Sequence, residues 1–282
     1  MKLDVKNYIE RETEKLSAVV SQMETKPKLV LIKASNDDAS DTYINNKVKQ
    51  CQKIGIESEV IRFDESITNE KLVSFVSELN NDDTVTGVLI QVPLFKHLDE
   101  NLILNSLSSE KDVDGFTNSN QGKLLNGNRD LVACTPKGIV DFLKSENILF
   151  PGMNTIIVNR SRIVGKPLAM LLLDEDCNVE ILHSKTKLDD LHEKVYNADL
   201  VITAIGKSDF WREWHFKEGS CIVDVSINFN EQGKLCGDIS KLDYEYLDFK
   251  DCKYTTVPGG VGPLTVLSLC KNVVQIAMKK CR

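Results

Sequence analysis

The segment NTIIVNRSRIVGKPLAMLL, residues 154–172, runs from a short apolar strand through a polar turn into an apolar helix. The pattern predicts that the strand ends at Val158 and that the helix begins near Gly165. A strand, a turn and a helix in succession form the setting in which α/β proteins bind a dinucleotide. The turn is not G-x-G-x-x-G, because Asn159 holds the first position, as a residue that tolerates left-handed backbone. We interpret the turn as a candidate cofactor site that depends on the rest of the chain.

Strand and helix patterns alternate on both sides of this segment. Apolar runs predict strands at 28–33, 58–63, 85–90, 154–158, 178–182, 198–205 and 220–225, and periodic segments predict helices between most of them. Such alternation is typical of parallel α/β sheets. The polar interval 117–130 breaks the alternation and is expected to be irregular. After it, Thr135 is placed to cap a helix that has Pro136 in its first turn.

These patterns predict two α/β domains. Residues 1–136 form the first domain, and residues 137–263 form a second, Rossmann-like domain with a parallel sheet. The last helix, residues 264–280, has apolar side chains on one face and is expected to return to the first domain, so that 264–282 complete it.

Composition restricts the function classes. The 282 residues are 41% hydrophobic and 27% charged, as in soluble globular proteins. A net charge of −7, from 35 Lys and Arg against 42 Asp and Glu, disfavours a general nucleic-acid or anionic-membrane binder. No signal-like segment or long apolar run is evident, so we expect a cytoplasmic protein. Eight cysteines without a C-x-x-C pair suggest neither a zinc site nor a disulfide framework, and we expect them to be reduced and buried.

Candidate catalytic groups lie in the first domain. Tyr43 and Lys47 are four residues apart and share one face of a predicted helix. Gln91 ends an apolar strand before Pro93, so it is expected at the carboxyl edge, where ligands of open α/β sheets bind. The alternatives are a solvated lysine that packs on a tyrosine ring and an amide that bonds to its own loop. A functional Lys47 requires burial or a hydrogen-bonding partner, and Gln91 offers one.

Asp112 and Asp114 flank Val113 in the segment KDVDGF. They are either metal ligands or one substrate anchor beside one structural cap. No histidine or third carboxylate is near in sequence, which disfavours a metal. A carboxylate can accept two parallel N–H bonds from an amino-heterocycle.

The strand at 178–182 is followed by a basic, hydroxyl-rich run. That run, HSKTK at 183–187, contains Ser184 and stands where NAD enzymes place an acidic residue for the ribose. Together with Arg160 it suits a 2′-phosphate, which favours NADP over NAD. Glu180 lies inside the strand pattern and is a poorer ribose ligand.

A last motif, TVPGGVGPLTV at 256–266, places three glycines and two prolines between Pro258 and Pro263. It is either a tight connection into the final helix or a loop that presents backbone groups to a flat ligand or a phosphate.

Taken together, the motifs resemble a known family. SDTYINNK, GVLIQVPL, KDVDGF, CTPKGIVDFL, NRSRIVGKPLAMLL, AIGK, VDVSIN, GDI and TVPGGVGPLTV follow the order and spacing of bifunctional methylenetetrahydrofolate dehydrogenase/cyclohydrolases, from about Lys28 to the C-terminus. The resemblance implies a catalytic domain, a Rossmann-like NADP domain, a folate cleft between them and a homodimer. It also implies oxidation of 5,10-methylenetetrahydrofolate, hydrolysis of the methenyl product to 10-formyltetrahydrofolate, and a link to purine biosynthesis.

Catalytic-side roles carry over position by position. By resemblance, Lys47 is the catalytic lysine and Gln91 its hydrogen-bonding partner. Tyr43 stacks on the aminobenzoyl part of the substrate, and Asp114 anchors the pterin.

Other positions are assigned to cofactor and substrate contacts. The expected cofactor residues are Asn159, Arg160, Ser161, Gly165, Ser184 and Ile227, and the expected further substrate contacts are Pro258, Gly259 and Gly260. The chain departs from the family at two of the glycines near the cofactor: Asn159 precedes the Arg-Ser pair and Ser226 precedes Ile227.

Three rival interpretations remain at this point. The chain resembles, less closely, two-domain NADP dehydrogenases that act on shikimate or amino acids, but these do not need Tyr43 or the glycine-proline loop. It is otherwise a monofunctional dehydrogenase of the same family, or a nucleotide-binding module that has lost its chemistry.

Overall fold

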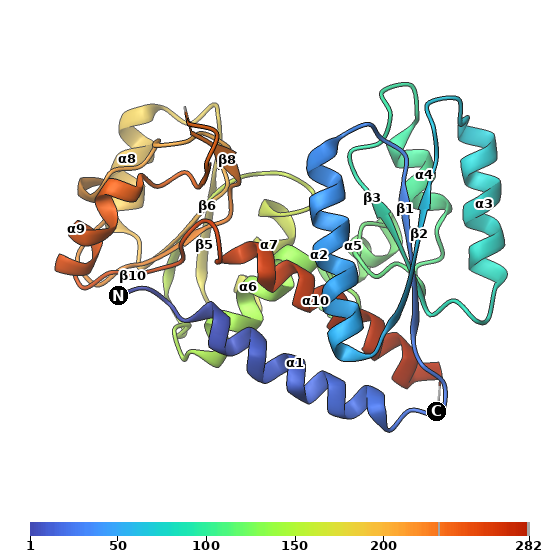
Figure 1. The fold of residues 1–282 in the computed structure, drawn as a ribbon. Helices are drawn as coiled ribbons and strands as arrows, with labels where there is room; N and C mark the ends of the chain where they lie inside the picture. The colour runs from blue at the N-terminus through green and yellow to red at the C-terminus, as the bar shows by residue number, and fades with distance from the viewer. Residues whose placement is uncertain (231, 281–282) are drawn as a thin grey trace. The chain divides into compact units, whose positions relative to one another are not determined.

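The structure is a computed structural model that describes residues 1–230 and 232–280 and divides into two compact units (Figure 1). The N-terminal unit contains Glu10–Cys134 and the residues from Val266 onward. The central unit contains Met1–Ile9 and Thr135–Thr265.

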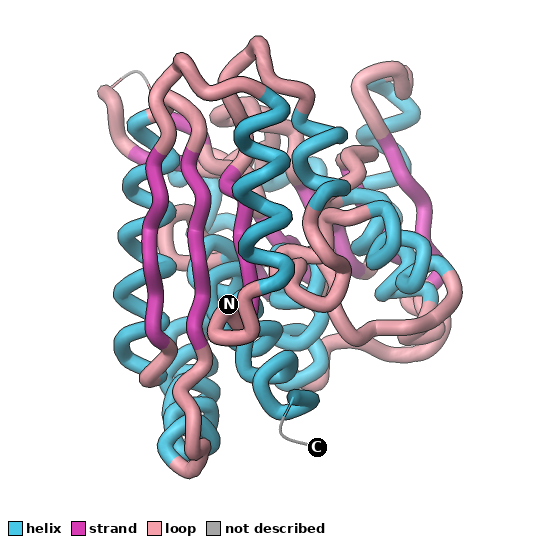
Figure 2. The backbone as a smooth tube through the Cα atoms, turned by 90° about the vertical axis from the view of Figure 1, so that its right-hand side faces the viewer, coloured by secondary structure: helices cyan, strands magenta, loops and turns pink. Residues whose placement is uncertain are grey.

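The N-terminal unit is built on a parallel sheet in the order β2-β1-β3. Its strands are β1 (Lys28–Lys33), β2 (Glu57–Arg62) and β3 (Gly87–Gln91), which lie side by side in Figure 2. Its helices are most of α1 (Val5–Ser21), α2 (Asp38–Ile54), α3 (Asn69–Asn81), α4 (Glu100–Ser106), α5 (Asn118–Leu125) and the larger part of α10 (Val261–Lys280). Because helices cover both faces of the sheet, β1 is buried at every position after Lys28 and is apolar from Leu29 to Ile32.

Two apolar clusters lie in this unit. One joins α3 and α4 to the sheet through residues such as Leu72, Val76 and Ile103. The other contains Ile44 and Cys51 of α2 together with residues of α10, which include Leu269, Cys270 and Val273. The predicted return of the C-terminal helix to the first domain is therefore confirmed.

Helix α10 differs from the sequence expectation in two ways. It begins at Val261, one turn early, and so places Pro263 in its first turn, where a missing N–H is tolerated. It is also the one helix among the described residues that is long and apolar enough to cross a membrane. Since 61% of its apolar window is buried within the protein, it has the character of a core helix.

The central unit contains a five-stranded parallel sheet in the order β10-β7-β6-β4-β5. Its strands are β4 (Asn154–Val158), β5 (Asn178–Leu182), β6 (Leu200–Thr203), β7 (Cys221–Asp224) and β10 (Lys253–Tyr254). Its helices are α6 (Cys134–Ser145), α7 (Gly165–Leu173), α8 (Leu188–Asn197) and α9 (Tyr244–Phe249), with short turns η1 (Glu213–His215) and η2 (Lys241–Asp243). A small antiparallel hairpin joins β8 (Asn228–Phe229) to β9 (Leu235–Cys236). This is the Rossmann-like domain that the sequence predicted.

Two local expectations were wrong. The interval 117–130 contains helix α5, because the Thr117 hydroxyl accepts a hydrogen bond from the Asn120 N–H and caps the helix. Thr135 does not precede helix α6 but lies inside it, and its hydroxyl is 2.9 Å from that of Thr265.

The cysteines behave as small apolar residues. Cys51, Cys134, Cys177, Cys221, Cys236, Cys252 and Cys270 are free and buried. Cys281 lies outside the described residues.

Asp112 holds the connection between α4 and α5. Its carboxylate is buried and accepts hydrogen bonds from the N–H groups of Phe116 and Thr117, at 3.2 and 2.8 Å, and from Asn120 Nδ2 at 3.0 Å. Of the alternatives left open by the sequence, the structural cap is the role that these bonds give to Asp112.

We predict that Asp112→Ala lowers the free energy of unfolding by about 3 kcal/mol, because it leaves buried donors without an acceptor. Urea unfolding followed by circular dichroism measures the change. Glu110→Ala is the matched control, since Glu110 is an exposed carboxylate on the same segment. Equal unfolding midpoints for the two variants would contradict the role given to Asp112.

Candidate active site

The carboxyl edge of the N-terminal sheet brings together Lys47 and Gln91. Gln91 is the last residue of β3, and Lys47 lies on helix α2. Only 8% of the Lys47 side chain is exposed, and its Nζ donates to Gln91 Oε1 at 2.9 Å. The Gln91 amide orients the buried lysine without adding a charge of its own.

Gln91 also bonds to its own loop. Its Nε2 donates to the backbone oxygen of Val92 at 2.8 Å. Because the amide nitrogen is held there, the amide oxygen faces Lys47. Gln91 therefore makes both contacts that the sequence left open: its amide oxygen binds Lys47, and its amide nitrogen bonds to its own loop.

Tyr43 lies one turn before Lys47 on α2 and is half-buried. Burial, followed by the negative charge of Asp37, raises the pKa of its hydroxyl. The ring therefore stays neutral at physiological pH and has a partly accessible apolar surface.

Asp114 lies close to Lys47. Burial raises the pKa of Asp114, while the charge of Lys47 and a hydrogen bond from Cys134 act in the opposite direction. Asp114 as a whole residue is less buried than Asp112, although its carboxyl group is shielded from solvent. Lys47, Gln91 and Asp114 thus form one polar cluster within the N-terminal unit.

The backbone around Asp114 is fixed from two sides. Gly115 has φ +65°, and a Cβ at this position would lie 2.7 Å from the backbone nitrogen of Ala133, so only glycine fits. From α10, Asn272 Nδ2 donates to the backbone oxygens of Val113 and Val132 at 2.8 and 3.1 Å. Sequence patterns gave no signal for Asn272, since a single asparagine in an apolar helix has no partner in sequence.

In the central unit, the turn after β4 is held by the side chain of Asn159. Its Oδ1 accepts from the N–H groups of Ser161 and Gly165, at 2.8 and 3.2 Å. Asn159 was expected to adopt a left-handed backbone conformation in this turn. That expectation was wrong, because the residue is not at positive φ. Gly165 is required, since a Cβ there would lie 2.1 Å from the Asn159 backbone oxygen.

The other expected cofactor residues lie on loops of the same unit. Arg160 and Ser161 follow β4, and Ser184 follows β5, the neighbouring parallel strand, so all three are at one edge of the sheet. Arg160 and Ser184 are exposed, and Ile227 is 41% exposed on the loop after β7.

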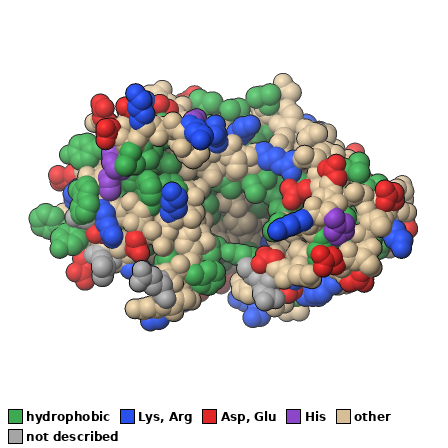
Figure 3. All heavy atoms as spheres, turned by 90° about the horizontal axis from the view of Figure 1, so that it is seen from above, with side chains coloured by type: hydrophobic (Ala, Val, Ile, Leu, Met, Phe, Trp, Pro, Cys, Tyr) green, Lys and Arg blue, Asp and Glu red, His purple; other side chains and the backbone are tan. Residues whose placement is uncertain are grey.

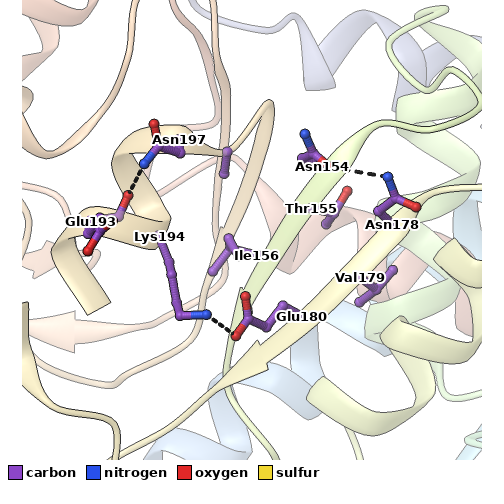
Figure 4. Close-up of a pocket in the computed structure, with 10 residues that line it drawn as sticks. Asn154, Thr155, Ile156, Asn178, Val179, Glu180, Glu193, Lys194 and Asn197 are labelled. Carbon is purple, nitrogen blue, oxygen red and sulfur yellow. Dashed lines mark hydrogen bonds and ion pairs between the residues drawn. The ribbon is translucent and has the colours of Figure 1, made fainter. Parts of the chain in front are cut away.

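Glu180 lies elsewhere, as expected for a residue inside the strand. It forms an ion pair with Lys194 in a shallow pocket between β4, β5 and α8 (Figure 4). The pocket includes Asn154 and Asn178, the first residues of β4 and β5. It therefore extends to the amino end of the sheet and not to the loops that follow these strands.

Sequence reasoning missed two buried carboxyl groups next to these loops. Asp224 ends β7, and Asp238 follows β9; neither is exposed to solvent. Burial, and then the nearby charge of Asp238, raise the pKa of Asp224 to about 7. The motifs VDVSIN and GDI contained both residues, but nothing in their sequence spacing shows that they meet.

The residues Pro258, Gly259 and Gly260 lie in the central unit, just before α10. Pro258 and Gly259 are exposed, and Gly259 has φ +99°. The loop therefore presents backbone at the surface of its unit.

On the face drawn in Figure 3, acidic and basic side chains are interspersed.

Two family models match the chain. Residues 3–114 match the catalytic domain of tetrahydrofolate dehydrogenase/cyclohydrolase, and residues 133–281 match its NAD(P)-binding domain. The bifunctional protein FolD of Ligilactobacillus salivarius is 43% identical over 265 residues, which are 94% of this chain and 91% of that protein.

Solved structures give the same result. The FolD methylenetetrahydrofolate dehydrogenase/cyclohydrolase of Campylobacter jejuni has a TM-score of 0.94 and 38% identity, and the match covers 99% of each chain. The Trypanosoma brucei enzyme, solved with NADP and an inhibitor, has a TM-score of 0.91 and 28% identity over 100% of this chain and 98% of that one. The chain therefore belongs to the tetrahydrofolate dehydrogenase/cyclohydrolase family.

Proposed function

We propose that the chain oxidises 5,10-methylenetetrahydrofolate to 5,10-methenyltetrahydrofolate with NADP and hydrolyses that product to 10-formyltetrahydrofolate. The observation that carries the proposal is the buried Lys47, bound to Gln91 at 2.9 Å within the segment that matches the catalytic domain. We further propose a cytoplasmic homodimer that supplies one-carbon units for purine biosynthesis. The membership of the family and the net charge of −7 support this over nucleic-acid or membrane binding.

Lys47 is proposed as the general acid/base of the hydrolytic step. Water adds to the methenyl carbon and the ring then opens, so protons must be moved. Gln91 orients the lysine nitrogen and adds no charge of its own. Asp114 is near enough for its charge state to depend on Lys47.

Substrate binding is assigned to Asp114 and Tyr43. A carboxylate accepts parallel N–H bonds from an amino-heterocycle such as a pterin, and an accessible tyrosine ring stacks on a flat aryl group. Pro258, Gly259 and Gly260 are proposed as further substrate contacts; Pro258 and Gly259 are exposed and offer backbone groups, whereas Gly260 is buried behind them. The division into a folate-binding domain (1–136 with 264–282) and an NADP domain (137–263) remains a proposal.

The residues of the central unit fit a dinucleotide. The close approach of Gly165 to Asn159 forms the tight strand-to-helix turn that such a site requires. Arg160, Ser161 and Ser184 would hold the phosphates, and Ile227 would be a further cofactor contact. When bound, NADP accepts the hydride of the substrate, and the chain contributes positioning and exclusion of water.

The first test follows absorbance of the purified chain with 5,10-methylenetetrahydrofolate and either NADP or NAD. We expect reduced nicotinamide to form with NADP without build-up of the methenyl product, because the second activity consumes it. Build-up of methenyl product would instead indicate a monofunctional dehydrogenase. Binding of nucleotide without turnover would support a module that has lost its chemistry.

We predict that Lys47→Met lowers the cyclohydrolase rate at least about 100-fold, the usual contribution of a positioned acid/base. The dehydrogenase rate should fall less than about tenfold, since loss of a hydride needs no proton transfer. Rates with methenyl and methylene substrates measure the two effects separately. Lys49→Met is the control, as an exposed lysine on the same helix. Equal losses of both activities in a folded variant would count against the role.

We predict that Asp114→Asn raises the KM for the folate substrate by about 10- to 100-fold, because one acceptor oxygen is replaced by an amide donor. The KM for NADP should stay within about twofold, since Asp114 is in the N-terminal unit. Initial-rate kinetics with each substrate varied in turn give both constants. Glu110→Gln is the matched control. An unchanged folate KM would remove Asp114 from the pterin site.

A further inference from the structure

The strand order of the central sheet marks one position for a ligand. From β4, the chain proceeds to β5 on one side and to β6 on the other, so the order reverses between β4 and β6. Ligands of open α/β sheets bind at such a reversal, outside the carboxyl ends of the strands. The loop after β4 begins with Asn159, and the loop after β6 is Ala204–Lys207. For brevity, Ala204–Lys207 is called the β6 loop.

The carboxylate of Asp238 binds the backbone of the β6 loop. Its carboxylate accepts hydrogen bonds from three successive backbone N–H groups and three side chains: Ile205 N (2.8 Å), Gly206 N (3.0 Å), Lys207 N (3.0 Å), Thr203 Oγ1 (2.7 Å), Ser226 Oγ (2.8 Å) and Asn228 Nδ2 (3.2 Å). Carboxylates that accept this many bonds are strongly held, and charge-assisted bonds are roughly twice as strong as neutral ones. Asp238 therefore fixes the β6 loop and also fixes the residues on both sides of Ile227.

Ser226 and Asn159 bind the same loop from its two sides. The Ser226 hydroxyl accepts from Gly206 N at 3.0 Å while it donates to Asp238. Asn159 Nδ2 donates to the backbone oxygen of Ala204 at 2.8 Å and so spans the reversal between β4 and β6. Both side chains therefore converge on the β6 loop.

We propose that Asp238, Ser226 and Asn159 are positioning residues that hold the β6 loop and Ile227 in the geometry that binds the nucleotide. The inference rests on the proposed function, because it presumes that NADP binds at the reversal of the strand order. A loop that is already ordered loses less conformational entropy when the ligand binds, so these bonds raise affinity without contacting the ligand. The competing interpretation is that the three side chains contribute only to the stability of the unit.

Two alanine variants separate these interpretations. Ser226→Ala and Asn159→Ala each remove a side-chain link to the β6 loop, and neither residue is at positive φ, so alanine fits the backbone. Asn159→Ala also removes the bonds from the Ser161 and Gly165 N–H groups, so Ser226→Ala is the variant that acts on the β6 loop without touching the turn after β4. Ser220→Ala is the matched control, since the buried Ser220 hydroxyl donates to Lys217 O in the same unit but makes no bond to the β6 loop. Asp238→Asn replaces one acceptor oxygen by a donor.

The Kd of NADP is measured by titration calorimetry on the full chain without folate, and amide hydrogen exchange of residues 204–207 is measured without NADP. We expect Ser226→Ala and Asn159→Ala each to raise the Kd about three- to tenfold, the effect of one neutral hydrogen bond, and to speed exchange in the β6 loop. Their double variant should raise the Kd by less than the product of the single effects, because both act on one loop. Asp238→Asn should raise the Kd at least about tenfold. Ser220→Ala should change neither quantity.

The outcomes also separate this inference from the proposed function. If the unmodified chain binds no NADP, the proposed function itself fails. If it binds NADP, and Ser226→Ala and Asn159→Ala bind with the same Kd while their melting temperatures fall like that of Ser220→Ala, the residues are structural only and the inference is overturned. Should Asp238→Asn not fold, the two alanine variants still decide the question.

Discussion

In both units, every strand of the main sheet runs parallel, and this constraint places the chemistry. Parallel strands need a crossover that returns to the starting edge, so helices occupy the faces and the carboxyl ends gather at one edge. In the N-terminal unit that edge carries Lys33 and Gln91, which are paired in register. In the central unit it carries the loops after β4, β5, β6 and β7. Residues distant in sequence thus meet without any long loop.

Two buried lysines lie near the carboxyl edge of the sheet in the N-terminal unit, and they differ in the side chain that binds their ammonium group. Lys33 Nζ lies 2.6 Å from the carboxylate of Asp41, which also contacts Arg62. Lys47 Nζ instead donates to the amide of Gln91. Lys33 is therefore held by an ion pair, whereas Lys47 is oriented by a neutral hydrogen bond and has the carboxyl group of Asp114 close by.

Much of this arrangement could be predicted from the sequence, because hydrophobic periodicity gives the strands and helices directly. The pairing of Lys47 with Gln91 followed from a helix face and a strand end, two positions that periodicity defines. Helix α5 was missed because five of its eight residues are polar and it depends on the Thr117 cap and the buried Asp112. Asp238 could not be foreseen either. Its partners lie 10 to 35 residues earlier in the chain and come together only when β6 and β7 pair.

The side chains that hold these loops also change how a phosphate can be bound. In a glycine-rich turn, backbone N–H groups at the start of the helix are open to the ligand. In this chain the N–H groups of Ser161 and Gly165 donate to Asn159, and that of Val164 donates to the Ser161 hydroxyl. In the β6 loop, three further N–H groups donate to Asp238. On the function proposed above, these donors are already used within the protein, and the exposed Arg160 side chain next to the turn would supply positive charge for a phosphate. In this proposed site, the turn after β4 and the β6 loop would give the nucleotide pocket its shape, and the Arg160 side chain would give it positive charge.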